Sequence, residues 1–203
     1  MLSSGVRIKF SKVGSLQFIS HLDLNRTMKT VMIRAGVPIK YSEGFNPHPK
    51  MVFALPLSVG TESVTEYLDF KITRPMTEEE MTERLNSAFP PEMRVLSAYE
   101  PSSKFTDVKY AEYVLESDVD FSVEPLEAES IVVLKRTKSG EKETDIKPLI
   151  RSYIKNGNTL TVVLSASPDS YLNPDYVSKL LGIPDCTVMR TRVLLSDGVT
   201  EFK

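Results

Sequence analysis

The chain has 203 residues, of which 41% are hydrophobic and 26% charged, and its formal net charge is −2. A chain of this length and composition builds its own core as one large or two small globular domains, so it needs no disulfide or metal to fold. Its single cysteine, Cys186, excludes a disulfide framework, a cysteine-rich zinc site and a self-contained iron–sulfur cluster.

The pattern of apolar residues argues against membrane insertion and secretion. No apolar run approaches the roughly 18 residues that a transmembrane helix needs. The first residues, Met1 to Arg7, lack the charged start and apolar core of a secretory signal. We therefore expect a cytoplasmic protein without a membrane partner.

The charge is unevenly distributed along the chain. Residues 1–56 hold eight Lys or Arg against two Asp or Glu, a net charge of +6, and the rest holds 17 against 25, a net charge of −8. An overall charge near zero argues against a dedicated nucleic-acid binder. The basic N-terminal third nevertheless indicates a site for an anionic ligand, and the alternative is a soluble surface with uneven charge.

The first half of the chain predicts the order strand, helix, strand, strand, helix, strand. Ser20 and Asp23 form a capping box for a first helix that ends near Gly36, and Thr77 opens a second helix. Alternating or β-branched segments predict four strands, over residues 7–10, 51–55, 66–72 and 94–99. This order is that of a ferredoxin-like βαββαβ unit, which we place at residues 1–101.

The second half repeats this pattern less cleanly, with one strand more than a strict repeat needs. Strands are predicted over residues 109–115, 131–136, 142–149, 159–164 and 188–195, and helices over residues 124–129 and 175–181. The second and third of these strands would form a hairpin around Ser139-Gly140. With a boundary in the polar segment 101–104, the fold class is α+β, with two tandem ferredoxin-like or nearly ferredoxin-like units, the second at residues 105–203.

The densest group of candidate binding residues is the segment Tyr41–Lys50, Tyr-Ser-Glu-Gly-Phe-Asn-Pro-His-Pro-Lys. Gly44 permits a tight turn, and Pro47 and Pro49 push the residues before them into extended conformations. Two prolines also lower the entropy lost when such a loop is ordered. The segment is typical of a rigid binding loop, although a loop that only connects helix to strand remains the alternative.

The side chains of this loop supply four kinds of chemical group. Because alternate residues of an extended segment share a side, Asn46, His48 and Lys50 should project together. Phe45 or Tyr41 would offer a stacking surface. An amide, an imidazole, an ammonium and an aromatic ring together are suited to an anionic, partly aromatic ligand.

The second histidine of the chain, His21, lies in the first turn of the first predicted helix. A helix N-terminus disfavours the charged imidazolium, so a neutral ring that accepts a proton is one interpretation. A structural histidine bonded to a backbone carbonyl is the other. The spacing of His21, Asp23 and His48 is not that of a metal site, so we predict no metal.

Several motifs in the first third resemble the bacterial radical-SAM-linked protein family of unknown function. They are Arg7-x-x-Phe10-x-Lys12-x-Gly14, Phe18-Ile19-Ser20-His21-Leu22-Asp23-Leu24, Arg34-Ala35-Gly36, the loop at residues 41–50, Leu55-Pro56-Leu57, Glu62-Ser63 and Glu66-Tyr67-Leu68-Asp69. The resemblance covers most of the chain, and its specific motifs stop near Asp69.

In that family the module follows, or is encoded beside, a radical SAM enzyme that carries the cluster. The resemblance therefore implies a helper or substrate-presenting module whose partner is a radical SAM enzyme. It places the iron–sulfur cluster and S-adenosylmethionine in that partner, with no cofactor in this chain. The single cysteine agrees, because a cluster needs more thiolates than one.

Our leading hypothesis is a non-catalytic, RNA-binding or substrate-presenting accessory module. Basic side chains of the N-terminal third would contact phosphates, while an aromatic ring stacks on a base. The candidate nucleic-acid-binding residues are Lys9, Lys12, Arg26, Tyr41, Phe45, Asn46, His48 and Lys50.

Two alternatives belong to other functional classes. In the first, the chain is a metal-independent RNA-cleaving or RNA-modifying enzyme, with His21 as base and His48 or Lys50 as acid or charge stabiliser. That mechanism needs both imidazoles within about 10 Å of one another in an open cleft. In the second, the basic surface meets an acidic protein and the chain is an interaction adaptor.

Overall fold

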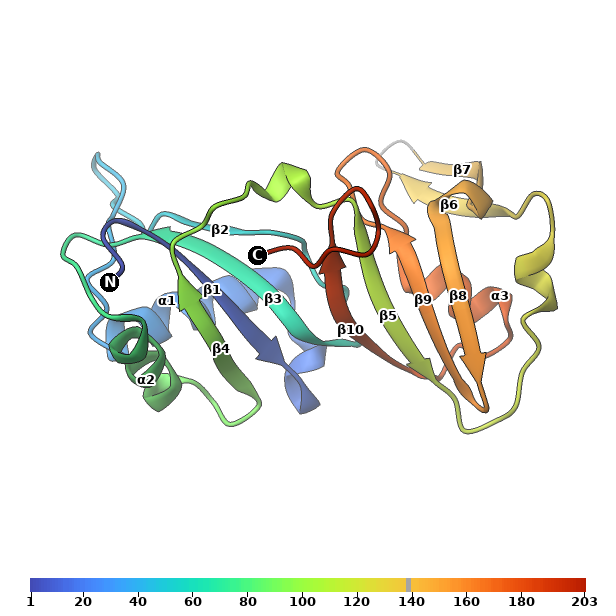
Figure 1. Cartoon of the computed structure of the whole chain (residues 1–203), viewed down its shortest axis with the longest axis horizontal. Coiled ribbons are helices and arrows are strands. Elements are labelled where there is room, and N and C mark those ends of the chain that lie inside the picture. The colour runs from blue at the N-terminus through green and yellow to red at the C-terminus, as the bar shows by residue number, and fades with distance from the viewer. Residues whose placement is uncertain (138–139) are drawn as a thin grey trace. The chain divides into compact units, whose positions relative to one another are not determined.

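The computed structural model describes residues 1–137 and 140–203, and the chain divides into two units (Figure 1). The first unit comprises Met1–Phe105 together with Lys203, and the second comprises Thr106–Phe202. Residue 139, part of the predicted hairpin turn, lies outside the described residues. The described residues form a mixed α+β protein.

The first unit, all of whose residues are described, has the element order that the sequence predicts. Its elements are β1 (Gly5–Lys12), the 3₁₀ helix η1 (Gly14–Phe18), α1 (His21–Arg34), β2 (Met51–Phe53), β3 (Thr61–Lys71), α2 (Glu78–Ala88) and β4 (Met93–Tyr99). The strands form an antiparallel sheet in the order β4-β1-β3-β2. The main differences from prediction are of length: β3 begins five residues earlier and β2 ends two residues earlier.

One face of this sheet is the apolar core of the unit. Val6, Ile8 and Phe10 of β1 are completely buried because alternate residues of a strand share a face. Both helices pack their apolar sides on this face through Leu24, Met28, Val31, Met32, Met81 and Leu85. The helices therefore cover one side of the sheet and leave β1 residues such as Arg7 and Lys9 directed to the other.

The helix starts are formed by the caps that the sequence predicts. The Ser20 hydroxyl accepts a hydrogen bond from the Asp23 amide at 3.1 Å, and it donates one to the Asp23 carboxylate at 2.7 Å. Thr77 caps α2 in the same way, accepting from the Glu80 amide at 3.1 Å. Each cap contributes about 1 kcal/mol by satisfying an amide that has no partner within the helix.

The second unit has a different element order. Its elements are β5 (Tyr110–Glu116), η3 (Glu124–Glu127), β6 (Val132–Thr137), β7 (Gly140–Asp145), η4 (Lys147–Leu149), β8 (Ile150–Asn156), β9 (Thr159–Ser165), α3 (Pro174–Leu180) and β10 (Thr187–Leu194), with η2 (Phe105–Asp107) at its start. Four strands form an antiparallel sheet in the order β10-β5-β9-β8. The predicted hairpin is present as β6 paired with β7, which form a small sheet of their own.

Two sequence-based expectations for the second unit are wrong in detail. The helix expected at residues 124–129 is a 3₁₀ helix of four residues, η3 (Glu124–Glu127), which is too short for an α-helix. Strand β8 was not predicted. It is paired on one side only, to β9, and its exposed Ile154 gives it no clear apolar face. No helix in the described part of the chain is both long enough and apolar enough to cross a bilayer.

Burial of Tyr113 in the second unit predicts a loss of stability at alkaline pH. Its side chain on β5 is 1% exposed, and desolvation raises the pKa of Tyr113 above its usual range. An unfolded tyrosine loses its proton at about pH 10. Because the folded pKa is higher, this contribution to stability is complete below about pH 10 and is lost as the pH rises further.

Denaturant unfolding between pH 8 and 11.5 tests this expectation. The wild-type protein should lose more unfolding free energy above pH 10 than the Tyr113→Phe variant, which has no phenol to titrate. Parallel curves for the two proteins would contradict it.

Candidate functional site

The loop at residues 41–50 is closed at its base by hydrogen bonds. The Ser42 amide donates to the His48 carbonyl at 2.8 Å, and the His48 amide donates to the Ser42 hydroxyl at 3.1 Å. Tyr41 and Pro49 pair as an isolated bridge next to these bonds. Gly44 has a φ of +118°, which a glycine adopts without strain. The loop thus presents residues 43–47 at its tip.

Phe45 at this tip is fully exposed to solvent. An apolar ring is normally at least partly buried, whereas this loop, closed by hydrogen bonds, exposes one to solvent. Tyr41 at the base is 39% exposed. Of the two aromatic residues that the sequence nominated, Phe45 offers the larger accessible ring.

His48 is oriented by the loop itself. Its Nδ1 lies 3.0 Å from the Ser42 hydroxyl and 3.3 Å from the Asn46 carbonyl oxygen. Because Nδ1 is engaged inside the loop, Nε2 is the ring nitrogen that a ligand would meet. The Asn46 main chain therefore positions His48.

Three exposed lysines meet beside the loop. The Lys40 amide donates to the Lys71 carbonyl at 2.7 Å, and the Lys50 amide donates to the Lys40 carbonyl at 3.2 Å. The backbones of Lys40, Lys50 and Lys71 are therefore adjacent, and their side chains are all exposed. The sequence nominated only Lys50, and we call these three residues the lysine cluster.

A groove of about 500 Å³ adjoins this cluster. It lies where β1 begins, β3 ends and β2 begins, and its lining residues are Gly5, Val6, His48, Pro49, Lys50, Met51, Val52, Asp69, Phe70, Lys71 and Pro101. The lining is mostly apolar, with cationic groups from two members of the lysine cluster. Two nominated residues, His48 and Lys50, thus share the groove, while Asn46 is not among its lining residues.

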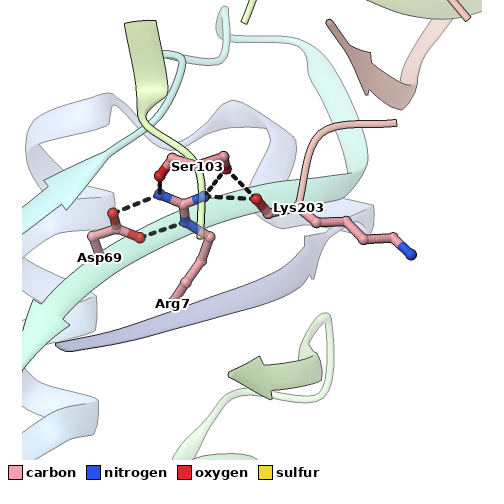
Figure 2. A network of polar contacts seen from close by, with 4 residues as sticks. All are labelled: Arg7, Asp69, Ser103 and Lys203. Carbon is pink, nitrogen blue, oxygen red and sulfur yellow. Dashed lines mark hydrogen bonds and ion pairs between the residues drawn. The ribbon is translucent and has the colours of Figure 1, made fainter. Parts of the chain in front are cut away.

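Asp69, the one carboxylate among these described lining residues, is neutralised by a buried arginine (Figure 2). Arg7 is 1% exposed, and its Nε and Nη2 donate to the two oxygens of Asp69 at 2.7 and 2.8 Å. Bidentate pairing of this kind is a strong, charge-assisted contact. The potential in the groove is therefore set by its lysines.

The remaining donors of Arg7 hold the segment after β4. Nη1 donates to the Ser103 hydroxyl at 2.8 Å and to the main-chain oxygen of Lys203 at 2.9 Å, and Nη2 donates to the Ser103 carbonyl at 3.1 Å (Figure 2). The Ser103 hydroxyl also donates to the Lys203 oxygen. The guanidinium lies 4.5 Å from the centre of the Phe105 ring. All five N–H donors of the side chain are thus used.

The two histidines occupy different surroundings. His21 is exposed at the start of α1, where its ring meets the edge of Phe53 at 5.1 Å between centroids. His48 contacts Ser42 and Asn46, and among the described residues no hydrogen bond or ring contact joins the two histidines. Phe53 lies five residues along an extended segment from His48, roughly 16 Å at about 3.3 Å per residue. The enzymatic pairing of these histidines stays a prediction.

The other nominated cations lie away from the groove lining. Lys12 is 1% exposed, and its Nζ donates to the main-chain oxygens of Leu16 and Gln17 at 3.0 and 3.3 Å. Lys9 lies over the ring of Tyr67 at 5.9 Å. Arg26 lies on α1, where it pairs with Asp23 at 3.1 Å. We therefore build the candidate site from the loop, the lysine cluster and the groove.

A metal centre finds no support in the described part of the chain, where no three His, Cys, Asp or Glu side chains gather closely enough to hold an ion. The Asp23 carboxylate is instead bound by the Ser20 hydroxyl and by Arg26, and these two contacts lower the pKa of Asp23. Asp23 therefore supports the capping residue Ser20 at the start of α1.

Comparison with known proteins gives one family. Residues 6–174 match the model of DUF2344, which is described as an uncharacterized protein conserved in bacteria. The match includes the loop, the lysine cluster and nearly all of the groove lining. No curated protein matches the chain.

Proposed function

The chain belongs to the bacterial family DUF2344, and from this premise we propose that it is an RNA-binding accessory module that presents unpaired RNA to a radical SAM enzyme. Binding is assigned to the tip of the loop and to the lysine cluster. In this proposal the partner supplies the iron–sulfur cluster and S-adenosylmethionine, and this chain supplies no catalytic group.

The fully exposed ring of Phe45 is the observation that carries the proposal. Unpaired bases stack on exposed aromatic rings, and each such contact contributes about 1–3 kcal/mol regardless of sequence. Bases inside a duplex are already stacked and do not reach a ring at a loop tip. The site is thus suited to single-stranded segments, loops or ends.

The lysine cluster supports the same ligand. Lys40, Lys50 and Lys71 are exposed and adjacent, so together they form a concentrated positive charge. Phosphates bind such a charge by releasing counterions, and this makes the affinity fall as salt rises. Glu43 is the one acidic side chain of the described loop, and its position at the exposed tip leaves the cluster uncompensated.

The sequence motifs support the radical SAM partner, and the strand order of the first unit supports a ferredoxin-like fold. The motifs at residues 7–69 resemble radical-SAM-linked modules. The order β4-β1-β3-β2, with both helices on one face, supports a ferredoxin-like assignment for the first unit. We do not extend that assignment to the second unit, whose element order differs.

Replacement of Phe45 tests the proposal. In fluorescence anisotropy with a labelled 12-nucleotide unpaired RNA, Phe45→Ala should weaken binding by about 5- to 150-fold, as expected for one lost stacking contact. Thermal stability should stay unchanged because the wild-type ring buries nothing. Wild-type affinity should also fall between 50 and 200 mM salt.

Phe18→Ala is the matched control. Phe18 is also strongly exposed in the first unit, at the end of η1, but it lies outside the loop. It should bind RNA like the wild-type protein. The proposal is overturned by a wild-type protein that does not bind RNA at low salt, or by equal losses in the two variants.

A further inference from the structure

The groove beside the loop has the size and lining of a small-molecule site. Its volume of about 500 Å³ falls within the roughly 300–1,000 Å³ of known ligand pockets. Met51, Val52 and Pro101, which are exposed or half-buried, supply the apolar surface. A site of this kind binds an apolar or aromatic body and fixes it with a few polar groups at the margin.

The polar groups of the groove select an anion. Lys50 and Lys71 contribute two ammonium groups, and His48 presents its Nε2, which is an N–H donor when its Nδ1 accepts from the Ser42 hydroxyl. The Asp69 carboxylate would repel an anion, but its charge is neutralised because both of its oxygens accept hydrogen bonds from the buried Arg7. The complementary ligand therefore combines a flat or apolar body with a negative head.

From this geometry we propose that the groove holds one nucleoside phosphate unit, an unpaired nucleotide of the bound RNA. Its base would lie on the apolar lining, and its phosphate would contact Lys50, Lys71 and His48. The inference rests on the proposed function, since it assigns a second nucleotide contact to the same RNA. The RNA-binding surface then has two parts: a stacking ring at the loop tip and a groove at the loop base.

One strand of RNA can reach both parts. Phe45 and His48 are three residues apart, so at most about 10 Å of chain separates them. The bonds between Ser42 and His48 close the base of the loop, next to the groove that His48 lines. Binding at the two parts should therefore be additive along one short single strand.

Titration of the full-length protein with AMP, adenosine and inorganic phosphate tests the groove directly. Calorimetry should show that AMP binds about tenfold or more tightly than adenosine or phosphate, because only AMP uses both the apolar lining and a charge-assisted contact. AMP should also displace the labelled 12-nucleotide RNA. Binding of AMP without displacement would assign the groove to a free nucleotide and overturn the RNA inference.

Gly5 offers a variant that fills the groove. An added Cβ at Gly5 meets no atom within 4 Å, and its φ lies outside the left-handed range, so a side chain is accommodated there. Gly5 lines the groove and pairs with Lys71 across β1 and β3. Gly5→Leu should reduce AMP affinity by at least about tenfold while the melting temperature stays unchanged, and Gly5→Ala should reduce it much less.

The outcomes separate this inference from the proposed function. Phe45→Ala should bind AMP like the wild-type protein, since Phe45 is not part of the groove. A wild-type protein that binds the RNA but not AMP, or a Gly5→Leu variant with full AMP affinity, overturns the groove assignment and leaves RNA binding in place. Failure of the wild-type protein to bind RNA while AMP binds normally overturns the proposed function and the assignment of the groove to RNA, and it leaves the groove as a site for a free nucleotide.

Discussion

Arg7→Ala should lower the unfolding free energy of the first unit by about 3–5 kcal/mol, the cost of removing one partner of a buried ion pair. Arg7 is 1% exposed and Asp69 28% exposed, so the carboxylate left behind is largely shielded from water. The oxygens of Ser103 and Lys203 lose their donors in the same variant. Arg7→Lys should recover only part of the loss, because an ammonium cannot form the bidentate contact.

The measurement must report on the first unit by itself, because a chain of two units does not have to unfold in one step. Amide hydrogen exchange in β1 and β3 gives that local free energy. Arg26→Ala is the matched control: its ion pair with Asp23 is 68% and 52% exposed, and it should cost at most about 1 kcal/mol. Equal losses for Arg7→Ala and Arg26→Ala would show that the buried network does not stabilise the unit.

Local sequence signals predicted the first unit well because its elements are marked by short-range chemistry. The capping box of Ser20 and Asp23 fixes where α1 begins, and Thr77 does the same for α2. The loop at residues 41–50 was found because two prolines restrict its backbone and a glycine permits a tight turn. These signals act over a few residues, so a single sequence contains them in full.

Long-range pairing explains what the sequence did not reveal. Lys71 joins Lys40 and Lys50 only because the end of β3 pairs with the segment before the loop, and no spacing in the sequence indicates this. The burial of Arg7 follows from contacts with Asp69 and with residues near 103, which also lie far away along the chain. The groove arises from the same contacts.

The sequence does contain a turn motif that indicates β8, the strand that was not predicted. Gly157-Asn158 separates β8 from β9, and a Gly-Asn pair is typical of a two-residue hairpin turn. Gly157 has a φ of +57°, as such turns require. This turn dipeptide indicates a strand before it, even though β8 shows little alternation of apolar and polar residues. The alternation is weak because the described strands pair with β8 on one side, through β9, and its Ile154 is exposed.

Replacement of the whole lysine cluster should have the largest effect on RNA binding. The triple variant Lys40→Ala, Lys50→Ala and Lys71→Ala should lose roughly 100- to 1,000-fold in affinity at low salt, as expected for three phosphate contacts of about 1 to 1.4 kcal/mol each, which is less than for buried charged groups because these contacts are exposed to water. The slope of log affinity against log salt should become shallower by about 2, since each lost contact to a single strand removes about 0.7. Stability should change little because all three side chains are exposed.

A second triple variant separates local contacts from net charge. Lys109, Lys142 and Lys179 are exposed lysines of the second unit, and their replacement by Ala changes the net charge by the same amount. This variant should keep most of the wild-type affinity and nearly the full salt slope, because lysines that do not contact phosphates release no counterions from the RNA. Equal losses in the two triple variants would mean that RNA senses only the overall charge. A loss confined to Lys40, Lys50 and Lys71 would place the phosphates beside the loop, within reach of the base stacked on Phe45.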